Sequence, residues 1–578
     1  MMLQEKQGNA HDQLGSVKEP VQQHHRSVDG EVGTTPGFAK NVAATELQEA
    51  APKLMRASGV VKSGNLLSAS TSRLVSCPIA SRITFLLGWI FTIFVVFTCE
   101  DYTERLANLH NVPVNQDEAG LHANLSSNYL GCEAGLVYVY SIPEAYNQEF
   151  VRECATFKKG RDLCMYMENW GMGSRFEFGA EQGGLSTERG PGPWHNTWQF
   201  ALELYFHERL QRHPCVTDRA ELANAFFVPY YAGMDLSRRF THRLAKDELY
   251  MELARWLQGQ ESWKRRQGRD HFIMLGRIAS DFRRPGGDRL WGNELLRQEV
   301  FNKMIVLSIE RTSGSFRKSA SVDKEIAIPY PTYFHDSSNA ELQNLIDWIG
   351  QTSQRSSLAT MAAGQRQAST NRMRHRLMTQ CSDDSRCTLL LCVGHEASPS
   401  LSEEMRNISL PVKMEGKTLN VLCNNPPVLL SAMHQSEFCL QPPGDSPTRR
   451  SFFDAMLVGC IPVIFQKEAA WSQYVHHLPQ DGASYSIFIP MTLANKRNVI
   501  DILSQVSKSR IHKMRANIAR LIPRILYASI NEMRSETPET SKYAGSSAEI
   551  PDAFDIALDA VLGRINSNLK FSRDANSS

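Results

Sequence analysis

The sequence predicts an α/β fold with two domains, and three observations lead to this prediction. The chain of 578 residues is 42% hydrophobic and 21% charged, which is ordinary for a globular protein. Short apolar runs alternate with longer amphipathic stretches, a pattern typical of parallel sheets covered by helices. A polar stretch that lacks strand character, residues 333–375, separates two such series. The formal net charge of +2 gives no basic excess, so nucleic acid is not an expected partner.

The first series occupies residues 131–350 and is expected to form the N-terminal domain. Its expected strands are runs of β-branched and aromatic residues, and its expected helices have apolar residues at helical spacing. The strands are Leu136–Tyr140, Ala225–Tyr231, His271–Leu275 and Glu325–Pro329; the helices include Thr197–Leu210 and Ala245–Trp256.

The second domain is expected over residues 351–565, with its first strand near Leu358 and a short tail at 566–578. Its most informative part is one strand, loop, helix and strand. The strand Phe438–Gln441 is followed by a loop at Pro442–Asp445, and Ser446–Pro447 has the N-cap and first-turn chemistry that opens a helix. Gly459 closes that helix, and Cys460–Phe465 is the next strand. Closing helices are expected at Ile511–Tyr527 and Ala553–Ile565.

The charges around this loop predict an anion site. A loop at the carboxyl end of a parallel strand, followed by a helix N-terminus, offers backbone N–H groups to a negative ligand. Arg449 and Arg450 lie where the helix dipole alone favours negative charge, and guanidinium groups grip phosphates in bidentate fashion. The alternative is that both arginines only form salt bridges with surface carboxylates.

The N-terminal region differs from the rest. Residues 1–82 are poor in aromatics and are expected to be a disordered cytosolic tail, and residues 100–130 a stem. Between them Ile83–Cys99 is apolar, uncharged and about long enough to cross a bilayer, whereas a buried core helix is the alternative. Basic residues precede this run and acidic residues follow it, so the positive-inside rule predicts a cytosolic N-terminus and a luminal remainder.

Cysteine usage agrees with a luminal location. Ten cysteines follow the apolar run, and this even number predicts disulfides in an oxidising compartment. For Cys439 and Cys460, which lie on expected buried strands, the alternative is that they stay free thiols. Asn124 and Asn407 lie in glycosylation triplets. The ten are Cys132, Cys154, Cys164, Cys215, Cys381, Cys387, Cys392, Cys423, Cys439 and Cys460.

Several motifs together resemble a known family. The segment Ser436–Val463, with its Gly-Asp-Ser-Pro-Thr-Arg-Arg-Ser and Gly-Cys-Ile-Pro-Val sequences, resembles the signature of the exostosin-like glycosyltransferases of family 47, most closely the plant xyloglucan galactosyltransferase group. Further matching segments spread the resemblance over roughly residues 130–565. They are Cys132–Tyr140, Trp194–Glu203, Ala225–Asp235, Gly268–Phe272 and Ile328–Thr332.

The resemblance implies a GT-B fold, two Rossmann-like domains that face a cleft, and an inverting transfer. In such a fold, residues 131–350 form the acceptor-side domain and residues 351–565 the nucleotide-sugar-binding domain. The chain has no D-x-D carboxylate pair, so neither a bound metal nor another cofactor is expected, and basic groups replace the cation. The implied reaction moves galactose from UDP-galactose to xyloglucan in the Golgi, with other wall-polysaccharide transferases as further partners. Alternatives are transfer of arabinopyranose or a uronic acid, and a non-catalytic luminal scaffold.

The resemblance also assigns roles in donor binding. Gly444 lets the backbone approach the donor, the loop residue Asp445 belongs to the same site, and Asp454 is expected to reach the ribose. Ser446 as a simple cap and Asp454 as an i,i+4 partner of Arg450 are the alternatives. The side chains expected at the diphosphate are Ser446, Arg449, Arg450 and Ser451.

The base that activates the acceptor should lie in the first domain, on a loop at the carboxyl end of a strand that faces the cleft. Asp235 and Asp281 follow expected strands, and His195 is a further candidate, whereas His271 within a strand is more typical of a core histidine. Around Leu358–Arg366 the chain departs from the family pattern, which leaves Arg366 open as a donor residue. Four aromatic residues are candidates for stacking on acceptor sugars, with ordinary core packing as the alternative: Trp194, Trp198, Tyr230 and Tyr231.

Overall fold

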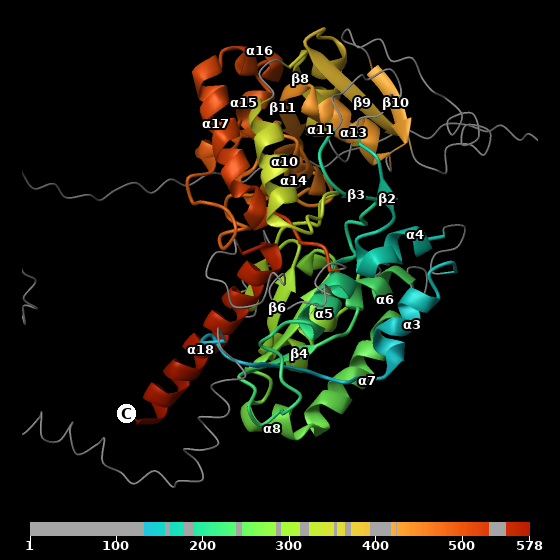
Figure 1. Cartoon of the computed structure of the whole chain (residues 1–578), viewed down its shortest axis with the longest axis vertical. Helices are drawn as coiled ribbons and strands as arrows, with labels where there is room; N and C mark the ends of the chain where they lie inside the picture. The colour runs from blue at the N-terminus through green and yellow to red at the C-terminus, as the bar shows by residue number, and fades with distance from the viewer. Residues whose placement is uncertain are drawn as a thin grey trace, which may run out of the picture. The chain divides into compact units, whose positions relative to one another are not determined.

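The computed structural model describes most of the chain after residue 131 (Figure 1). All described residues belong to one compact unit, Val112–Ser578. No helix among them combines the length and apolar character that a membrane crossing requires. The expected cytosolic tail, the membrane segment and the stem lie outside the described residues. So do Arg366 and both glycosylation triplets. The described ranges are 132–156, 162–178, 190–238, 245–284, 291–312, 323–351, 355–364, 372–393, 418–422, 425–530 and 551–577.

The first sheet is parallel throughout and has the strand order β1-β4-β5-β6-β7. The sequence predicts β5 at its observed bounds, and β1, β4 and β7 lie within longer predicted runs. β6 was not singled out, although Ile305-Val-Leu-Ser308 is a short apolar run of the kind that forms a buried strand. The strands are β1 (Val137–Val139), β4 (Ala225–Val228), β5 (His271–Leu275), β6 (Ile305–Ser308) and β7 (Glu325–Ala327).

Helices and short turns connect these strands. α5 begins at Leu202, five residues after the predicted start. Thr197 instead donates its hydroxyl to the carbonyl of Met172 and accepts a hydrogen bond from Arg450. α7 begins at Ala245 as predicted. The remaining elements of this part are η1 (Glu144–Tyr146), α3 (Gln148–Arg152), α4 (Cys164–Met167), η2 (Glu168–Gly171), β2 (Arg175–Phe176), β3 (Trp194–His195), α5 (Leu202–Gln211), α6 (Ala232–Arg238), α7 (Ala245–Gly259), α8 (Glu261–Arg266), η3 (Ala279–Phe282), η4 (Leu295–Arg297), α9 (Glu299–Lys303) and α10 (Asn339–Gln351).

The second sheet is also parallel, with the order β10-β9-β8-β11-β12-β13. The chain therefore adds strands to one side of β8 and then returns to add strands to the other, which is the order of a Rossmann sheet. Figure 1 shows β8, β9 and β10 side by side. The strands are β8 (Ser357–Gly364), β9 (Cys387–Val393), β10 (Thr418–Leu422), β11 (Ser436–Gln441), β12 (Ile461–Ile464) and β13 (Ile487–Phe488).

The helices of the second part include the two closing helices that the sequence predicts. α18 continues to Ser577, through the residues expected as a tail. These elements are α11 (Arg372–Ser382), α13 (Pro426–His434), α14 (Arg450–Leu457), η7 (Lys467–Ala469), η8 (Gly482–Ser484), α15 (Met491–Ala494), α16 (Val499–Ser504), α17 (Lys508–Leu521), η9 (Ile522–Ile525) and α18 (Ala553–Ser577).

The two sheets establish the predicted α/β class with two parallel sheets. The change from one sheet to the other falls between Ala327 and Ser357, an interval that contains the predicted boundary. Within this interval Trp348 of α10 stacks on His434 of α13 at 4.1 Å, so α10 packs with the second sheet. The closing helix α18 returns to the first sheet, where Arg209 of α5 lies 3.4 Å from Asp555.

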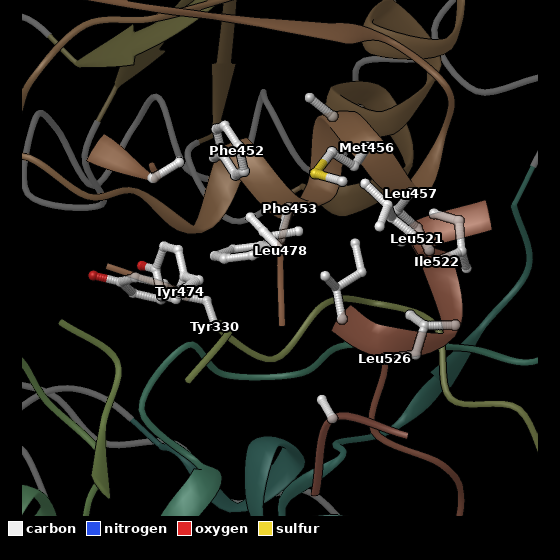
Figure 2. Packing of buried hydrophobic residues seen from close by; sticks show 14 of the residues in the cluster. Tyr330, Phe452, Phe453, Met456, Leu457, Tyr474, Leu478, Leu521, Ile522 and Leu526 are labelled. Atoms are coloured by element: carbon white, nitrogen blue, oxygen red, sulfur yellow. The ribbon is translucent and has the colours of Figure 1, made fainter. Parts of the chain in front are cut away.

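Helix α14 carries much of the apolar core of the second part (Figure 2). Phe453 lies 4.8 Å from the ring of Tyr474 and 6.3 Å from that of Tyr330, which follows β7 of the first sheet. After α14 the chain turns at Gly459, whose φ of +67° suits glycine, and a Cβ there would lie 2.8 Å from Ile349. Gly459 therefore closes the helix as predicted.

Cysteine pairs reinforce both sheets. The structure pairs Cys439 of β11 with Cys460 next to β12, so these two residues are not free thiols. Each disulfide restricts the unfolded chain and so favours the folded state. The other pairs among the described residues are Cys132–Cys215, Cys154–Cys164 and Cys381–Cys387.

Candidate active site

The strand order of the second sheet places the loop after β11 at a topological switch point. β8 and β11 are neighbours, and the chain leaves β8 toward β9 and leaves β11 toward β12 on the opposite side. In open parallel sheets, ligands bind beyond the carboxyl ends of the strands at such a point, because the two outgoing loops diverge there. The loop after β11, Pro442–Arg449, is the segment that the sequence singled out.

The helix after this loop begins later than predicted. α14 starts at Arg450, its N-cap is Arg449, and no side chain caps it, so the prediction that Ser446–Pro447 opens the helix was wrong. The physical reason is a tertiary contact. Glu310, two residues beyond β6, accepts a hydrogen bond from the backbone N–H of Thr448 at 3.0 Å and another from its hydroxyl. These bonds hold the loop extended up to Arg449.

Glu310 therefore joins the first sheet to the predicted donor loop. Burial raises its pKa, while hydrogen bonds from Ser446 and Thr448 act in the opposite direction. The hydroxyl of Tyr330 lies 3.1 Å from that of Thr448. Sequence reasoning missed Glu310, because nothing local marks a carboxylate whose partners lie more than a hundred residues away.

Three of the expected donor-binding residues, Gly444, Arg449 and Ser451, lie in or next to this loop. Arg449 donates to the carbonyl of Pro442 at 2.9 Å, and the hydroxyl of Ser451 donates to Gln441 at 2.5 Å. A Cβ on Gly444 would lie 3.3 Å from a guanidinium nitrogen of Arg374, which donates to Pro443. Asp445 is exposed, whereas Ser446 is half-buried. Arg449 and Arg374 thus each donate to one of two successive carbonyl groups of the loop.

Arg450 and Asp454 form a pair beneath the loop. The guanidinium carbon of Arg450 lies 3.5 Å from the ring centroid of Tyr333, and Nη1 donates to the carbonyl of Thr197. Nε lies 3.5 Å from the carboxylate of Asp454, whose pKa burial raises to about 6 although Arg450 opposes this change. The side chains are only 10% and 2% exposed. Nevertheless, Nη2 of Arg450 and Oδ1 of Asp454 have no hydrogen-bond partner among the described residues.

His195 is the base candidate that the structure brings close to Arg450. Its ring lies 5.4 Å from that of His335, and Nε2 of His335 lies 2.8 Å from the hydroxyl of Thr197, the residue whose carbonyl holds Arg450. His195 is fully buried, and burial together with the charge of Arg175 lowers its pKa to about 4. The imidazole is therefore neutral at pH 7.

The two carboxylate candidates lie beside the first sheet. Asp235 is fully buried within α6, not on a loop as predicted, and accepts a hydrogen bond from Tyr230 at 2.8 Å. Asp281 accepts from Arg277 at 2.9 Å and from the indole N–H of Trp291 at 2.7 Å. Asp281 thus already has a partner on each oxygen, which suits a residue that positions its neighbours.

Sequence reasoning also missed a buried carboxylate, Glu203 of α5. Its Oε1 accepts the backbone N–H groups of Gly233 and Gly276 at 2.7 and 2.9 Å, and Oε2 accepts that of Met234 at 3.1 Å. Burial raises its pKa to about 7, although these bonds favour the charged form. Glu203 fixes the backbone at the carboxyl ends of β4 and β5. The available signal was an acid between apolar residues on a predicted helix.

The aromatic candidates separate by exposure. Trp194, Tyr230 and Tyr231 are each 1% exposed and belong to the core, so they are not available to stack on an acceptor. Trp198 is partly exposed. His271 is a core histidine, as expected, because the hydroxyl of Tyr140 and the carboxylate of Asp270 each lie 2.8 Å from its ring nitrogens.

Among the residues that the structure describes, one group of potential metal ligands is present, and it lies far from this site in the sequence. Cys154, Asp162 and Cys164 bring their ligand atoms within 4.8 Å of one another. The two sulfurs, however, form a disulfide, and a metal ligand must be a thiolate. This group is therefore not a metal site.

Comparison with known proteins identifies the family. A model of the exostosin GT47 domain matches residues 131–506. The chain belongs to the exostosin GT47 family. It is 36% identical to a probable xyloglucan galactosyltransferase of Arabidopsis thaliana, over 75% of this chain and 83% of that protein. It is 32% identical to the Arabidopsis xyloglucan galactosyltransferase MUR3, over 75% and 63% of the two chains. These similarities confirm the predicted family resemblance and identify the chain as a glycosyltransferase.

A second kind of relative differs in the sugar. A xyloglucan-specific galacturonosyltransferase of Arabidopsis is 34% identical over 75% of this chain and 58% of that protein. Among solved structures, that of HepE of Anabaena with UDP aligns with 61% of this chain and 79% of the HepE chain. The sequence identity is 11% and the TM-score is 0.30. That score is low, and the fold described above rests on the strand order of the chain itself.

Proposed function

We propose that the chain is an inverting, metal-independent transferase of the GT-B type that moves galactose from UDP-galactose to side chains of xyloglucan. The similarity to proteins named xyloglucan galactosyltransferases supports the reaction class. The observation that carries the site is a pair of buried polar atoms that find no hydrogen-bond partner in the described part of the chain, Nη2 of Arg450 and Oδ1 of Asp454. A buried polar atom left unpaired costs about 1–3 kcal/mol, and a ligand that supplies both an acceptor and a donor removes this cost.

The nucleotide diphosphate is the ligand that fits these groups best. Its phosphates would lie at the loop Pro442–Arg449, where Arg449 and Arg374 supply positive charge. Hydroxyl groups of the ribose or of the sugar can donate to Asp454 and accept from Arg450. The two arginines near the loop would stabilise the charge that develops on the leaving diphosphate, the task that a metal performs in other transferases.

Asp235, Asp281 and His195 remain our proposed candidates for the base. A base takes a proton in the transition state, so its loss lowers kcat and leaves the KM for the acceptor nearly unchanged. The variants Asp235→Asn, Asp281→Asn and His195→Gln test each role in turn. A residue that only positions the acceptor would instead raise KM when substituted.

The first test of the function is transfer by the purified full-length chain in detergent. UDP-galactose and UDP-galacturonic acid are offered separately with a xyloglucan oligosaccharide, each with and without EDTA. We expect galactosyl product that persists in the chelator and falls strongly in Arg449→Ala, but not in the control Arg510→Ala on the exposed face of α17. Product from UDP-galacturonic acid alone would establish the alternative donor, which the 34% identical relative favours. No product from either donor would favour a non-catalytic scaffold.

We further propose that the protein is anchored in the Golgi membrane by Ile83–Cys99, with its N-terminus in the cytosol. The apolar run and its flanking charges support an anchor, and the four disulfides support an oxidising lumen. Protease added to intact Golgi vesicles should remove an N-terminal tag and spare a C-terminal one. Removal of the C-terminal tag in sealed vesicles would contradict this orientation.

A further inference from the structure

Partly exposed aromatic side chains surround Arg277, just beyond the carboxyl end of β5. The guanidinium carbon lies 4.1 Å from the ring centroid of Phe200 and 4.7 Å from that of Trp291. Trp198 packs edge-on against Phe200 at 5.4 Å. All four side chains are partly exposed. We propose that this aromatic cluster, Trp198, Phe200, Arg277 and Trp291, binds sugar rings of the polysaccharide acceptor, an inference that rests on the proposed function.

The cluster is held in place before any ligand binds. Asp281 is 10% exposed and accepts from both Arg277 and Trp291, so one carboxylate orients the guanidinium and the indole together. The backbone N–H of Asn293 donates to the carbonyl of Asp281 at 2.9 Å. Between Trp291 and Asn293, Gly292 has a φ of +87°, and a Cβ there would lie 2.6 Å from that same carbonyl oxygen. A surface fixed in this way binds with a smaller loss of side-chain entropy.

The chemistry of the cluster suits a neutral sugar. A pyranose ring has an apolar C–H face, which a flat aromatic side chain covers, and a rim of hydroxyl groups, which a guanidinium and a carboxylate recognise. Arg277 and Asp281 neutralise each other at 2.9 Å. Their net charge of zero does not favour a phosphate or an acidic chain over a neutral one. The expected occupant is therefore an uncharged glycan, as a xyloglucan backbone is.

The position of the cluster also fits an acceptor. Ala279, between Arg277 and Asp281, donates its N–H to the carbonyl of Glu310 at 2.9 Å, and the side chain of Glu310 binds Thr448 of the donor loop. Gly276, the first residue after β5, is held by Glu203 at 2.9 Å, and a Cβ there would lie 2.7 Å from the carbonyl oxygen of Phe200. Glu310 thus contacts both segments: its carbonyl binds the backbone of the cluster, and its carboxylate binds the proposed donor loop. A transfer requires the acceptor next to the donor.

The competing explanation is that the aromatic rings only pack on Arg277 and bind no sugar. The variant Trp291→Ala distinguishes sugar binding from such packing. With the purified full-length chain, we expect the acceptor KM for xyloglucan oligosaccharide to rise about tenfold, the loss of one good stacking contact, with the KM for UDP-galactose unchanged. Direct binding of the oligosaccharide without donor, measured by calorimetry, should weaken by the same factor. Trp291→Phe keeps a ring but loses the bond to Asp281, so its effect should be smaller.

The matched control is Trp256→Ala. Trp256 of α7 is also partly exposed, but it packs on Tyr140, which binds His271 at the opposite end of β5. Its replacement should leave both KM values unchanged. If wild-type chain transfers galactose while both Trp291 variants keep the wild-type acceptor KM and affinity, the inference is wrong and the proposed function stands. If the wild type transfers no sugar but binds the oligosaccharide, and Trp291→Ala abolishes that binding, the proposed function fails and the inference stands.

Discussion

Replacement of Arg450 by alanine should destabilise the protein by at least about 4 kcal/mol, because it removes three contacts of a guanidinium group that is only 10% exposed. The lost contacts are the stacking on Tyr333 at 3.5 Å, the hydrogen bond to Thr197 and the pairing with Asp454 at 3.5 Å. Stacking contributes about 1–2 kcal/mol and a charged hydrogen bond about 1.5–3 kcal/mol.

The contribution of Asp454 is limited by protonation. Burial raises the pKa of Asp454 from 3.8 to about 6 even with Arg450 present. In the intact protein the ionised form is therefore disfavoured by a net amount of about 3 kcal/mol. Without Arg450 the carboxyl would take up a proton at pH 7, and this uptake limits the additional cost to about 1.4 kcal/mol. These effects sum to about 4–6 kcal/mol, which overlaps the upper part of the range of about 3–5 kcal/mol for buried pairs that lose one partner.

A double variant separates structure from function. In Arg450→Met with Asp454→Leu, two apolar side chains of similar size replace the pair, and such replacements are often neutral for stability. We therefore expect the double variant to regain most of the lost stability in urea unfolding followed by tryptophan fluorescence. Transfer activity should stay absent, because the groups proposed to hold the donor are gone. As a control, Lys303→Ala removes an exposed pair with Glu299 at 2.8 Å and should change stability by less than about 1 kcal/mol.

Two results would refute this reasoning. A loss below about 1 kcal/mol in Arg450→Ala would mean that the pair is solvated and not buried. A double variant that regains both stability and transfer would mean that Arg450 and Asp454 only hold α14 in place. The donor would then have to bind through the loop and Arg449 alone.

Three further outcomes are expected. Replacing both Cys439 and Cys460 by alanine removes a link across 21 residues and should lower the free energy of unfolding by about 3 kcal/mol in urea; an unchanged urea midpoint under oxidising conditions would contradict the pairing. Glu310→Gln weakens the bonds to Thr448 and should raise the donor KM several-fold with less effect on the acceptor KM, whereas equal changes would point to general loosening. For His195, a folded pKa of about 4 against 6.5 means that the folded state binds fewer protons, so stability falls as the pH drops from 6.5 toward 4, by up to about 3 kcal/mol. His195→Gln should flatten that part of the stability profile, and an unchanged slope between pH 6.5 and 4 would refute the assignment.

Local patterns in the sequence determined the α/β class and the segment that matters most. The strand at Phe438–Gln441, the turn at Gly459 and the next strand are properties of short stretches, whose residue types favour one backbone conformation. The run with Gly444, Arg449 and Arg450 likewise indicated the candidate donor site, and it lies within residues 131–506, which match the exostosin GT47 family.

The tertiary structure decided where each of these side chains lies. Arg450 turned inward onto Tyr333 and Thr197, and the helix began at Arg450 because Glu310 holds the loop before it. These partners are more than a hundred residues apart in the chain, so no local pattern contains them.

In the first domain, too, the tertiary structure decided which candidate side chains are accessible. Trp194, Tyr230 and Tyr231 are aromatic residues in a matching motif, yet their exposed fractions of 1% place them in the core. Trp291, in contrast, is partly exposed beside Arg277, while its indole N–H donates to the buried Asp281. Sequence alone fixes which chemical groups are available, whereas exposure and the neighbours of each group depend on how distant segments pack, because burial is a property of the whole fold.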